Sequence, residues 1–299
     1  MNKSKKFFWN KLEYVCSRGI LYNCKSYDLN PISSSKNFQR NLSVLKDGET
    51  VYVCSSALPE FVKQIDALPC AIRLVTGDAD EDVPTDVFAT DGDFLQFINN
   101  PKIIHWYAQN CVIKHSKITP IPIGLDYHTL AEKTTSWGPQ KSPQEQEHDL
   151  EEIRAKSCPF WEREPAFCYA NFQFLMTTKY GWDRMDAIRS IPDFLVYYEP
   201  EKIPRNKTWE KQSKFSFVIS PHGNGLDCHR TWEALCLGCI PIVKSSPIDS
   251  LFTELPVLIV KKWGEINESK LRNTIEEFKK KNFDYQRLNL QFWLNKIKS

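Results

Sequence analysis

Residues 220–243 of the chain, SPHGNGLDCHRTWEALCLGCIPIV, bring glycines, two histidines, an arginine and a glutamate between two apolar runs. The pattern predicts a strand, a loop at Gly223, Asn224 and Gly225, and then a helix with Asp227 as its N-cap. A glycine loop that leads into a helix presents unpaired N–H groups and the positive end of the helix dipole. The segment therefore predicts an anion-binding site, with simple turn chemistry as the alternative.

Two charged residues of the predicted helix indicate which anion is bound. Arg230 lies in the first turn, where a cation opposes the helix dipole, and a bound diphosphate would explain that placement. Glu233 follows three residues later on the same side of the helix, where its carboxylate can accept hydrogen bonds from both hydroxyls of a ribose. An ion pair between Arg230 and Glu233 is the alternative. The spacing favours a nucleoside diphosphate.

The histidines and cysteines of this segment have separate roles. We expect His222 to contact phosphate or sugar, and His229 to be a hydrogen-bonded structural residue. Gly238 should end the helix as its C′ residue. Cys236 and Cys239 form a CxxC pair, but no second such pair completes a zinc site, so we expect reduced thiols.

The elements that must position these residues alternate along the chain. Short apolar runs rich in β-branched and aromatic residues predict strands, and stretches with helical spacing lie between many of them. Strands that read as continuous apolar runs and alternate with helices predict a parallel sheet, so the fold class is α/β. The predicted strands are residues 50–55, 71–76, 103–108, 118–123, 167–172, 194–198, 215–219, 240–243 and 257–260. The predicted helices are residues 59–67, 144–155, 182–191, 227–237, 268–279 and 283–298.

Composition narrows the classes of function. The chain has 299 residues, and 39 Lys and Arg against 37 Asp and Glu give a net charge of only +2. Such a balance does not favour nucleic acid as the main partner. We find no apolar run long enough for a signal peptide or membrane anchor, and expect a cytoplasmic protein whose 10 cysteines are reduced.

The combination of an R-x-x-E helix with a following G-C-I-P strand is familiar. Together with Gly223, Gly225, the segment 255–257 and Trp263, it resembles the donor-binding half of exostosin-like glycosyltransferases, including xylosyltransferase-type, algal and viral members. The resemblance is dense over about residues 165–265 and fainter over residues 51–124. It rests on several motifs at fixed distances rather than on a glycine loop alone.

This resemblance implies a GT-B fold, in which two Rossmann-like domains face each other across a cleft. It implies an N-terminal acceptor-binding domain over residues 1–160, with a linker from about residue 132, and a nucleotide-sugar-binding domain over residues 161–282. Residues 283–299 would form a C-terminal helix that crosses back to the first domain. The implied activity is inverting transfer of a sugar, with xylose as our expectation, from a UDP-sugar to a saccharide acceptor without a metal cofactor.

Inverting transfer needs a proton acceptor and positive charge on the departing diphosphate. Arg230 is the first candidate for the charge, and Arg184 is the second, with a surface ion pair to a neighbouring aspartate as its alternative. Acidic residues follow the predicted strand at 71–76, at the sheet edge where α/β proteins bind ligands. We expect Asp78 to be the general base and Asp80 to be its substitute.

Two other functions are compatible with these residues. The cluster Asp78, Asp80 and Asp82 resembles the acidic motif of metal-dependent GT-A transferases, although the helix with Arg230 already provides a metal-free diphosphate site. A non-catalytic nucleotide- or carbohydrate-binding protein on a transferase scaffold would bind UDP without turnover.

Overall fold

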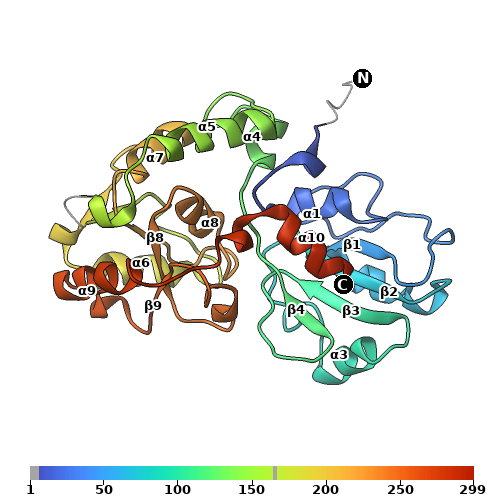
Figure 1. Ribbon diagram of the computed structural model, residues 1–299. Coiled ribbons are helices and arrows are strands. Elements are labelled where there is room, and N and C mark those ends of the chain that lie inside the picture. Colours follow the sequence, from blue (N-terminus) through green and yellow to red (C-terminus); the bar gives the residue numbers. More distant parts are fainter. Residues whose placement is uncertain (1–6, 164–166) are drawn as a thin grey trace.

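A computed structural model describes residues 7–163 and 167–299 as two α/β domains side by side (Figure 1). Within those residues, no helix combines the length and the apolar character needed to cross a membrane. The alternation of strands and helices expected from the sequence is confirmed, and both sheets are entirely parallel.

The first sheet has the order β1-β2-β3-β4. Its strands are β1 Thr50–Cys54, β2 Ile72–Gly77, β3 Ile103–Ala108 and β4 Ile118–Pro120. Because aliphatic and aromatic side chains line both faces, the central strands are buried on both sides, as expected for a sheet covered by helices and loops.

The second sheet has the order β6-β5-β7-β8-β9. Its strands are β5 Cys168–Ala170, β6 Val196–Tyr198, β7 Phe217–Ile219, β8 Ile240–Lys244 and β9 Leu258–Val260. The chain proceeds from β5 to β6 in one direction and from β7 to β9 in the other. The strand order therefore reverses between β5 and β7, and ligands of open α/β sheets bind at such a switch point.

A helix lies in each helical segment predicted from the sequence, and others are added. The predicted helix at 59–67 is divided into a short α-helix and a 3₁₀ turn, and only residues 290–298 of the predicted helix at 283–298 are α-helical. The α-helices are α1 Ser17–Asn23, α2 Leu58–Val62, α3 Asp91–Ile98, α4 His128–Glu132, α5 Pro143–Ala155, α6 Gly181–Ser190, α7 Arg205–Gln212, α8 His229–Cys236, α9 Glu268–Phe278 and α10 Leu290–Lys298. Short 3₁₀ turns are η1 Trp9–Lys11, η2 Ser55–Ala57, η3 Ile65–Ala67, η4 Phe160–Glu162, η5 Asp193–Leu195, η6 Asp249–Leu251, η7 Trp263–Glu265 and η8 Tyr285–Leu288. The sequence patterns miss α1, α3, α4 and α7 because these helices are short or mostly polar.

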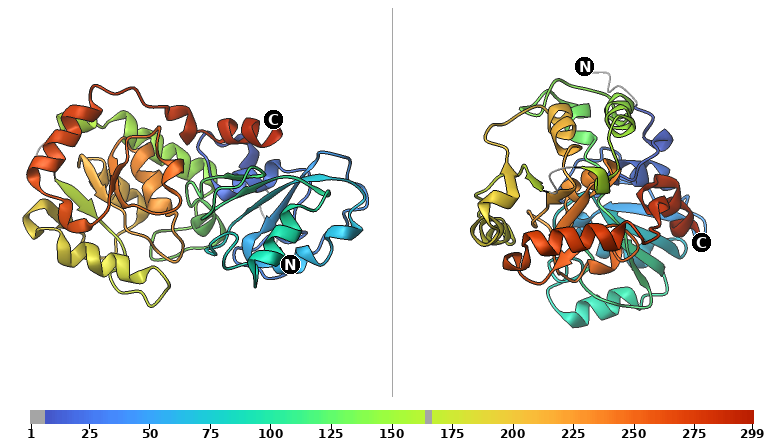
Figure 2. Two further views of the ribbon diagram at one scale, coloured as in Figure 1. Left: turned by 90° about the horizontal axis from the view of Figure 1, so that it is seen from below. Right: turned by 60° about the vertical axis from the view of Figure 1, so that its left-hand side comes forward.

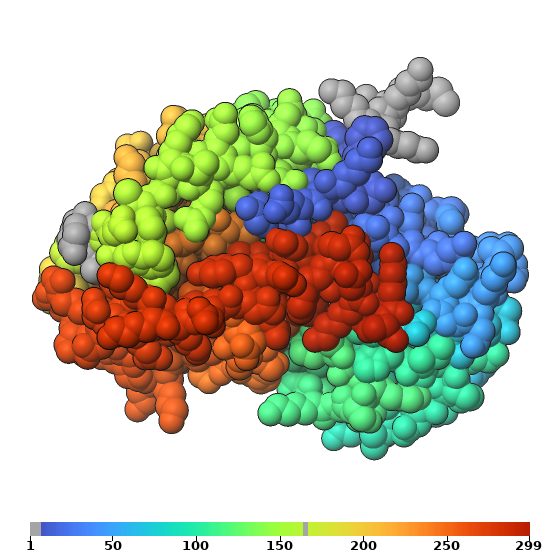
Figure 3. All heavy atoms as spheres, in the orientation of Figure 1, coloured from blue at the N-terminus to red at the C-terminus, as the bar shows by residue number. Residues whose placement is uncertain are grey.

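The C-terminal helix crosses back to the first domain, as the resemblance implied. Figure 2 shows the end of the chain leaving the second domain and placing α10 beside the first sheet. The amide of Leu290 donates to the carbonyl of Glu13 at 2.7 Å, and a Cβ at Gly19 of α1 would lie 2.9 Å from the Leu290 side chain. On the face shown in Figure 3, this C-terminal segment extends over the boundary between the domains.

An apolar core is continuous across the domain boundary. Ile123 and Leu125 of the first domain belong to the same buried cluster as Leu226 and Trp232 of the second, together with Trp293 of α10. Burial of large side chains on both sides stabilises the contact between domains. The loops after β2, β3 and β4 therefore meet the loop after β7 in a packed boundary.

Candidate active site

The start of α8 differs from the sequence expectation in its cap. The N-cap is Cys228, whose side chain makes no capping hydrogen bond, and not Asp227. The carboxylate of Asp227 accepts instead from the amide of Ile123 at 2.8 Å and from the indole N–H of Trp232 at 2.8 Å. The side chain of Asp227 therefore links the loop before α8 to Ile123 of the first domain by a hydrogen bond.

The glycines before α8 are required by close packing rather than by unusual backbone angles. A Cβ at Gly223 would lie 2.8 Å from Nη2 of Arg184, and one at Gly225 would lie 2.8 Å from Nδ2 of Asn110. The expectation of free loop amides needs a correction at one position, because the N–H of Gly223 donates to the carbonyl of Gly225 at 3.1 Å. The exposed Asn224 hydrogen-bonds the Asp80 side chain across the boundary.

The structure brings together the two predicted diphosphate-binding arginines. The guanidinium carbons of Arg184 and Arg230 lie 5.8 and 5.1 Å from the centre of the same Phe172 ring. Arg184 donates from Nε to the carbonyl of His222 at 3.0 Å, and Arg230 donates from Nη2 to the carbonyl of Pro221 at 2.8 Å. We call these two side chains the arginine pair.

Within the described residues, the arginine pair has no carboxylate in direct contact, although the more distant charges of Asp183 and Glu233 act on it. Neither guanidinium forms an ion pair with a carboxylate in the described part of the chain, where the buried Nε of Arg230 also has no hydrogen-bond partner. Burial, followed by the charge of Arg230, lowers the pKa of Arg184 to about 10, and burial also lowers the pKa of Arg230. Neighbouring buried cations are costly without a counter-charge, so this environment favours a bound anion.

The arginine pair lies at the switch point of the second sheet. Phe172 follows β5, whereas Pro221 and His222 follow β7, and the strand order reverses between these two strands. Arg184 comes from α6 and Arg230 from α8. Two helices thus deliver cations to the sheet edge where α/β domains hold ligands.

The structure excludes the simple ion pairs that were the alternatives for these residues. Asp183 accepts from the Trp263 indole and Asp186 pairs with Lys244, so neither forms an ion pair with Arg184, although the charge of Asp183 opposes part of the lowering of the Arg184 pKa. Glu233 lies 3.9 Å, Oε1 to Nε, from Arg205 and forms no ion pair with Arg230. The Glu233 side chain remains 13% exposed, which leaves its carboxylate accessible.

His222 is buried, its carbonyl accepts from Arg184, and the residue also lines a neighbouring cavity. Its Nδ1 donates to the carbonyl of Leu226 at 2.9 Å, and its amide donates to Asp183 at 2.9 Å. It lines a cavity of about 540 Å³ together with Tyr180 and Trp182. Of the predicted donor-site residues, His222 alone lines this cavity, so the cavity and the arginine pair are separate features.

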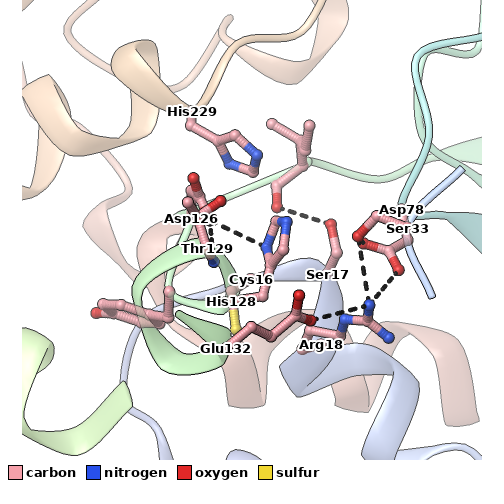
Figure 4. Close-up of polar contacts among 12 residues, drawn as sticks. Cys16, Ser17, Arg18, Ser33, Asp78, Asp126, His128, Thr129, Glu132 and His229 are labelled. Atoms are coloured by element: carbon pink, nitrogen blue, oxygen red, sulfur yellow. Dashed lines mark hydrogen bonds and ion pairs between the residues drawn. The ribbon is translucent and has the colours of Figure 1, made fainter. Parts of the chain in front are cut away.

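Asp78 does not have the environment expected of a general base. It follows β2 with a left-handed backbone, φ 60°. One carboxylate oxygen lies 3.2 Å from Nη2 of Arg18 and the other accepts from the Ser33 hydroxyl at 2.9 Å, while the side chain is only 3% exposed. Both oxygens are therefore engaged, and Asp78 forms a buried ion pair with α1 (Figure 4), whereas the expected general base needs an accessible carboxylate oxygen.

The other acidic residues of this loop take separate partners. Asp80 is exposed at the domain boundary, where desolvation raises the pKa of its carboxyl while the Asn224 hydrogen bond opposes that shift. Asp82 is paired with Lys179 at 2.7 Å and hydrogen-bonded by the Tyr180 hydroxyl. Because Asp78, Asp80 and Asp82 point to different partners, they do not form the acidic metal motif considered from the sequence.

A second cluster, which sequence reasoning did not assign, lies after β4 (Figure 4). Nδ1 of His128 lies 3.0 Å from Oδ1 of Asp126, and the His128 ring centre is 6.1 Å from that of His229. Oδ2 of Asp126 lies 2.9 Å from Nη2 of Arg205. His229 donates from Nδ1 to the carbonyl of Gly124 at 2.7 Å, which agrees with its expected structural hydrogen bond. In the sequence, the signal for this cluster is the D-x-H spacing of Asp126 and His128 shortly after a predicted strand.

No family model matches the chain, and neither does any curated protein. The exostosin-like assignment is therefore not confirmed. Among solved structures, the chain is similar to an α1,3-fucosyltransferase with GDP-fucose, with TM-score 0.41, 10% identity, and coverage of 89% of this chain and 95% of that one. It is also similar to a structure described as trehalose-6-phosphate from E. coli bound with UDP-2-fluoro glucose, with TM-score 0.41, 9% identity, and coverage of 86% and 74%.

Proposed function

We propose that the protein is an inverting glycosyltransferase that moves a sugar from a UDP-sugar to a hydroxyl of a saccharide acceptor. The single observation that carries the proposal is the arginine pair: two cations on one aromatic ring, at the switch point of a parallel sheet, without a carboxylate in direct contact in the described residues. A diphosphate supplies the missing negative charge. It also becomes more negative as the glycosidic bond breaks, which is when fixed cations stabilise it most.

The groups around the arginine pair support a complete donor site. Glu233 lies on α8 three residues after Arg230 and would accept hydrogen bonds from the ribose hydroxyls. His222, Gly223, Asn224 and Gly225 belong to the adjoining loop and would contact the diphosphate or the sugar. Since the positive charge comes from side chains, the proposed reaction does not require a divalent cation. Xylose, taken from the exostosin-like resemblance, is the first sugar to test.

The proposed reaction also needs a proton acceptor on the first-domain side of the boundary. With Asp78 held in its ion pair, other carboxylates and imidazoles there are the candidates. Glu132, at the end of α4, is 58% exposed, but its Oε1 lies 3.7 Å from Nη2 of Arg18. Asp80, the predicted substitute, is exposed, and the side chain of His128 is 18% exposed. Asp80 and His128 are both close to His229, the first residue of α8. The charge of His229 lowers the pKa of Asp80, and the ring centres of His128 and His229 are 6.1 Å apart.

The donor site is tested by measuring UDP affinity with calorimetry. We expect Arg230→Ala to raise the Kd for UDP about 10- to 100-fold, because hydrogen bonds to charged groups contribute about 1.5–3 kcal/mol. Glu233→Ala should weaken UDP less, since it removes only the ribose contact. Arg272→Ala, at an exposed arginine paired with Glu268 on α9, is the matched control. Unchanged UDP affinity in Arg230→Ala would contradict the proposed donor site.

Turnover is tested with UDP-xylose, UDP-glucose, UDP-galactose and UDP-N-acetylglucosamine. Release of UDP from one of these donors is expected, and EDTA should leave the rate unchanged. UDP binding without release from any donor would instead indicate a binding protein on a transferase scaffold. Loss of activity in EDTA with recovery in Mn²⁺ would refute the metal-independent mechanism.

A further inference from the structure

The side chain of His128 is oriented by a buried carboxylate. His128 begins α4, and its Nδ1 lies 3.0 Å from Oδ1 of Asp126, which also accepts from the amide of Thr129 at 3.0 Å. Because a carboxylate offers only acceptors, this contact favours the tautomer in which Nδ1 of His128 carries the proton. In that tautomer Nε2 is the acceptor nitrogen, and it has no hydrogen-bond or ion-pair partner among residues 7–163 and 167–299.

Asp126 is itself fixed as an anion. Arg205 donates to its main-chain carbonyl and, from Nη2 at 2.9 Å, to Oδ2. Burial alone would raise the pKa of the Asp126 carboxyl, but Arg205, and then His128 and His229, bring the pKa below its usual range. Asp126 therefore remains ionised beside the imidazole and stabilises it when it takes a proton.

The contacts of this cluster also place His128 close to the second domain, across the domain boundary. Arg205 begins α7 of the second domain, and its Nε is 3.9 Å from Glu233 on α8. His229, next to Arg230 on α8, has its ring centre 6.1 Å from that of His128. His128 thus belongs to the first domain but borders the helix that carries the proposed diphosphate-binding arginine.

We infer that His128 is the proton acceptor of the transfer reaction, with Asp126 and Arg205 as positioning residues; this inference rests on the proposed function. The acceptor oxygen forms a bond to the anomeric carbon while the bond from that carbon to the UDP oxygen breaks. The acceptor's proton passes to Nε2 of His128, and the electron pair of the broken bond remains on UDP. The imidazolium then releases its proton to solvent.

The neighbouring groups are less suited to this role. Asp78 has both carboxylate oxygens engaged by Arg18 and Ser33. Glu132, on the same helix as His128, is exposed, but its carboxylate is paired with Arg18 at 3.7 Å. Asp80 is exposed and hydrogen-bonded by Asn224, with no second group in the described residues that orients it as Asp126 orients His128. His229 donates from Nδ1 to the carbonyl of Gly124, and no carboxylate of the described residues forms an ion pair with its ring, in contrast to His128.

The test measures the rate of UDP release from the best donor of the four, with water or a saccharide as acceptor, across pH. In the wild type the rate should fall toward acid pH as the base becomes protonated. His128→Ala should lower kcat about 10²- to 10⁴-fold, the usual contribution of general base catalysis, and remove the acid limb. UDP affinity should be unchanged, and added imidazole should restore part of the rate. Asp126→Asn should lower kcat without recovery in imidazole.

Several outcomes overturn the inference. His148→Ala, at an exposed histidine of α5, is the matched control and should behave like the wild type. If His128→Ala keeps its kcat, loses UDP affinity or gains nothing from imidazole, His128 is not the base. A loss of the acid limb in Asp80→Asn, with that limb retained in His128→Ala, would assign the base to Asp80. A wild type that releases UDP from none of the four donors refutes the proposed function itself.

Discussion

At the scale of single residues, the position of the arginine pair depends on the space that small neighbouring residues leave for it. Gly223 has no side chain, and this lets Nη2 of Arg184 come within 2.8 Å of the position that a Cβ would take. Arg184 is then held by the His222 carbonyl and stacked on Phe172. The need for glycine at this position comes from the cation beside it.

Gly223→Ala therefore tests the position of Arg184. The added methyl group should displace the guanidinium, because it is the movable end of a long side chain. We expect the Kd for UDP to rise about tenfold, equivalent to about 1.4 kcal/mol, while the melting temperature changes little. Gly264→Ala, where a Cβ would meet no atom within 4 Å, is the control and should bind UDP normally. Wild-type UDP affinity in Gly223→Ala would show that Arg184 does not need this space.

At the scale of elements, α8 is defined by what lies at its two ends. At its N-terminus, the N-cap residue Cys228 makes no capping hydrogen bond with its side chain. Its C-terminus follows the predicted pattern: Gly238 is left-handed with φ 70°, and a Cβ there would clash with the guanidinium of Arg154 of α5. The proposed ligand lies at one end of the helix, and the glycine at the other end contributes to stability.

Gly238→Ala should therefore destabilise the fold. A left-handed backbone costs a residue with a Cβ about 1–2 kcal/mol, and Arg154 must also move. Unfolding in urea should show a free energy of unfolding lower by at least about 1 kcal/mol. Gly92→Ala, in the first turn of α3 where the nearest atom is 3.5 Å from the added Cβ, should not be destabilising. Equal stability of the two variants would contradict this account.

At the scale of the whole molecule, a few buried polar contacts fix the domains relative to each other. Asp227 joins the Ile123 amide of the first domain to the Trp232 indole of α8. The side chain of Asn110 accepts from the amide of Asp227 at 2.9 Å. Both the main chain and the side chain of Asp227 are therefore hydrogen-bonded to the first domain. These contacts hold the loop before α8 against the first domain.

Asp227 makes the stability of this boundary depend on pH. Burial raises the pKa of Asp227 from 3.8 to about 6 in the folded protein. Since the folded pKa is above the unfolded value, this group favours folding below about pH 4 and loses that contribution as the pH rises to about 6. Asp227→Asn, which resembles the protonated side chain, should gain stability relative to the wild type over this window, on the order of 1–3 kcal/mol.

Urea unfolding of both proteins at pH 4, 5, 6 and 7 measures this difference. Parallel stability profiles would contradict the raised pKa of Asp227. A lower stability of the variant that is constant across pH would instead reflect only the lost hydrogen-bond acceptor.

The sequence by itself determined the α/β class, the approximate positions of the strands in the described residues, the end of α8 at Gly238 and the choice of Arg230 as a candidate for binding an anion. These features depend on short-range patterns: apolar runs for strands, glycine after a helix, and a cation placed against the helix dipole. The same patterns predicted acidic residues at the edge of the first sheet, because strand ends can be read from the sequence. Arg184 was proposed from the family resemblance instead.

Only the tertiary structure decided which of these groups are available for chemistry. Asp78 is neutralised by Arg18 because α1, a short helix without a clear pattern, packs against the end of β2. Asp126 orients His128 only because Arg205 arrives from the other domain. The protonation and accessibility of a side chain depend on charges that are distant in the sequence, and only folding brings those charges within a few ångströms of one another.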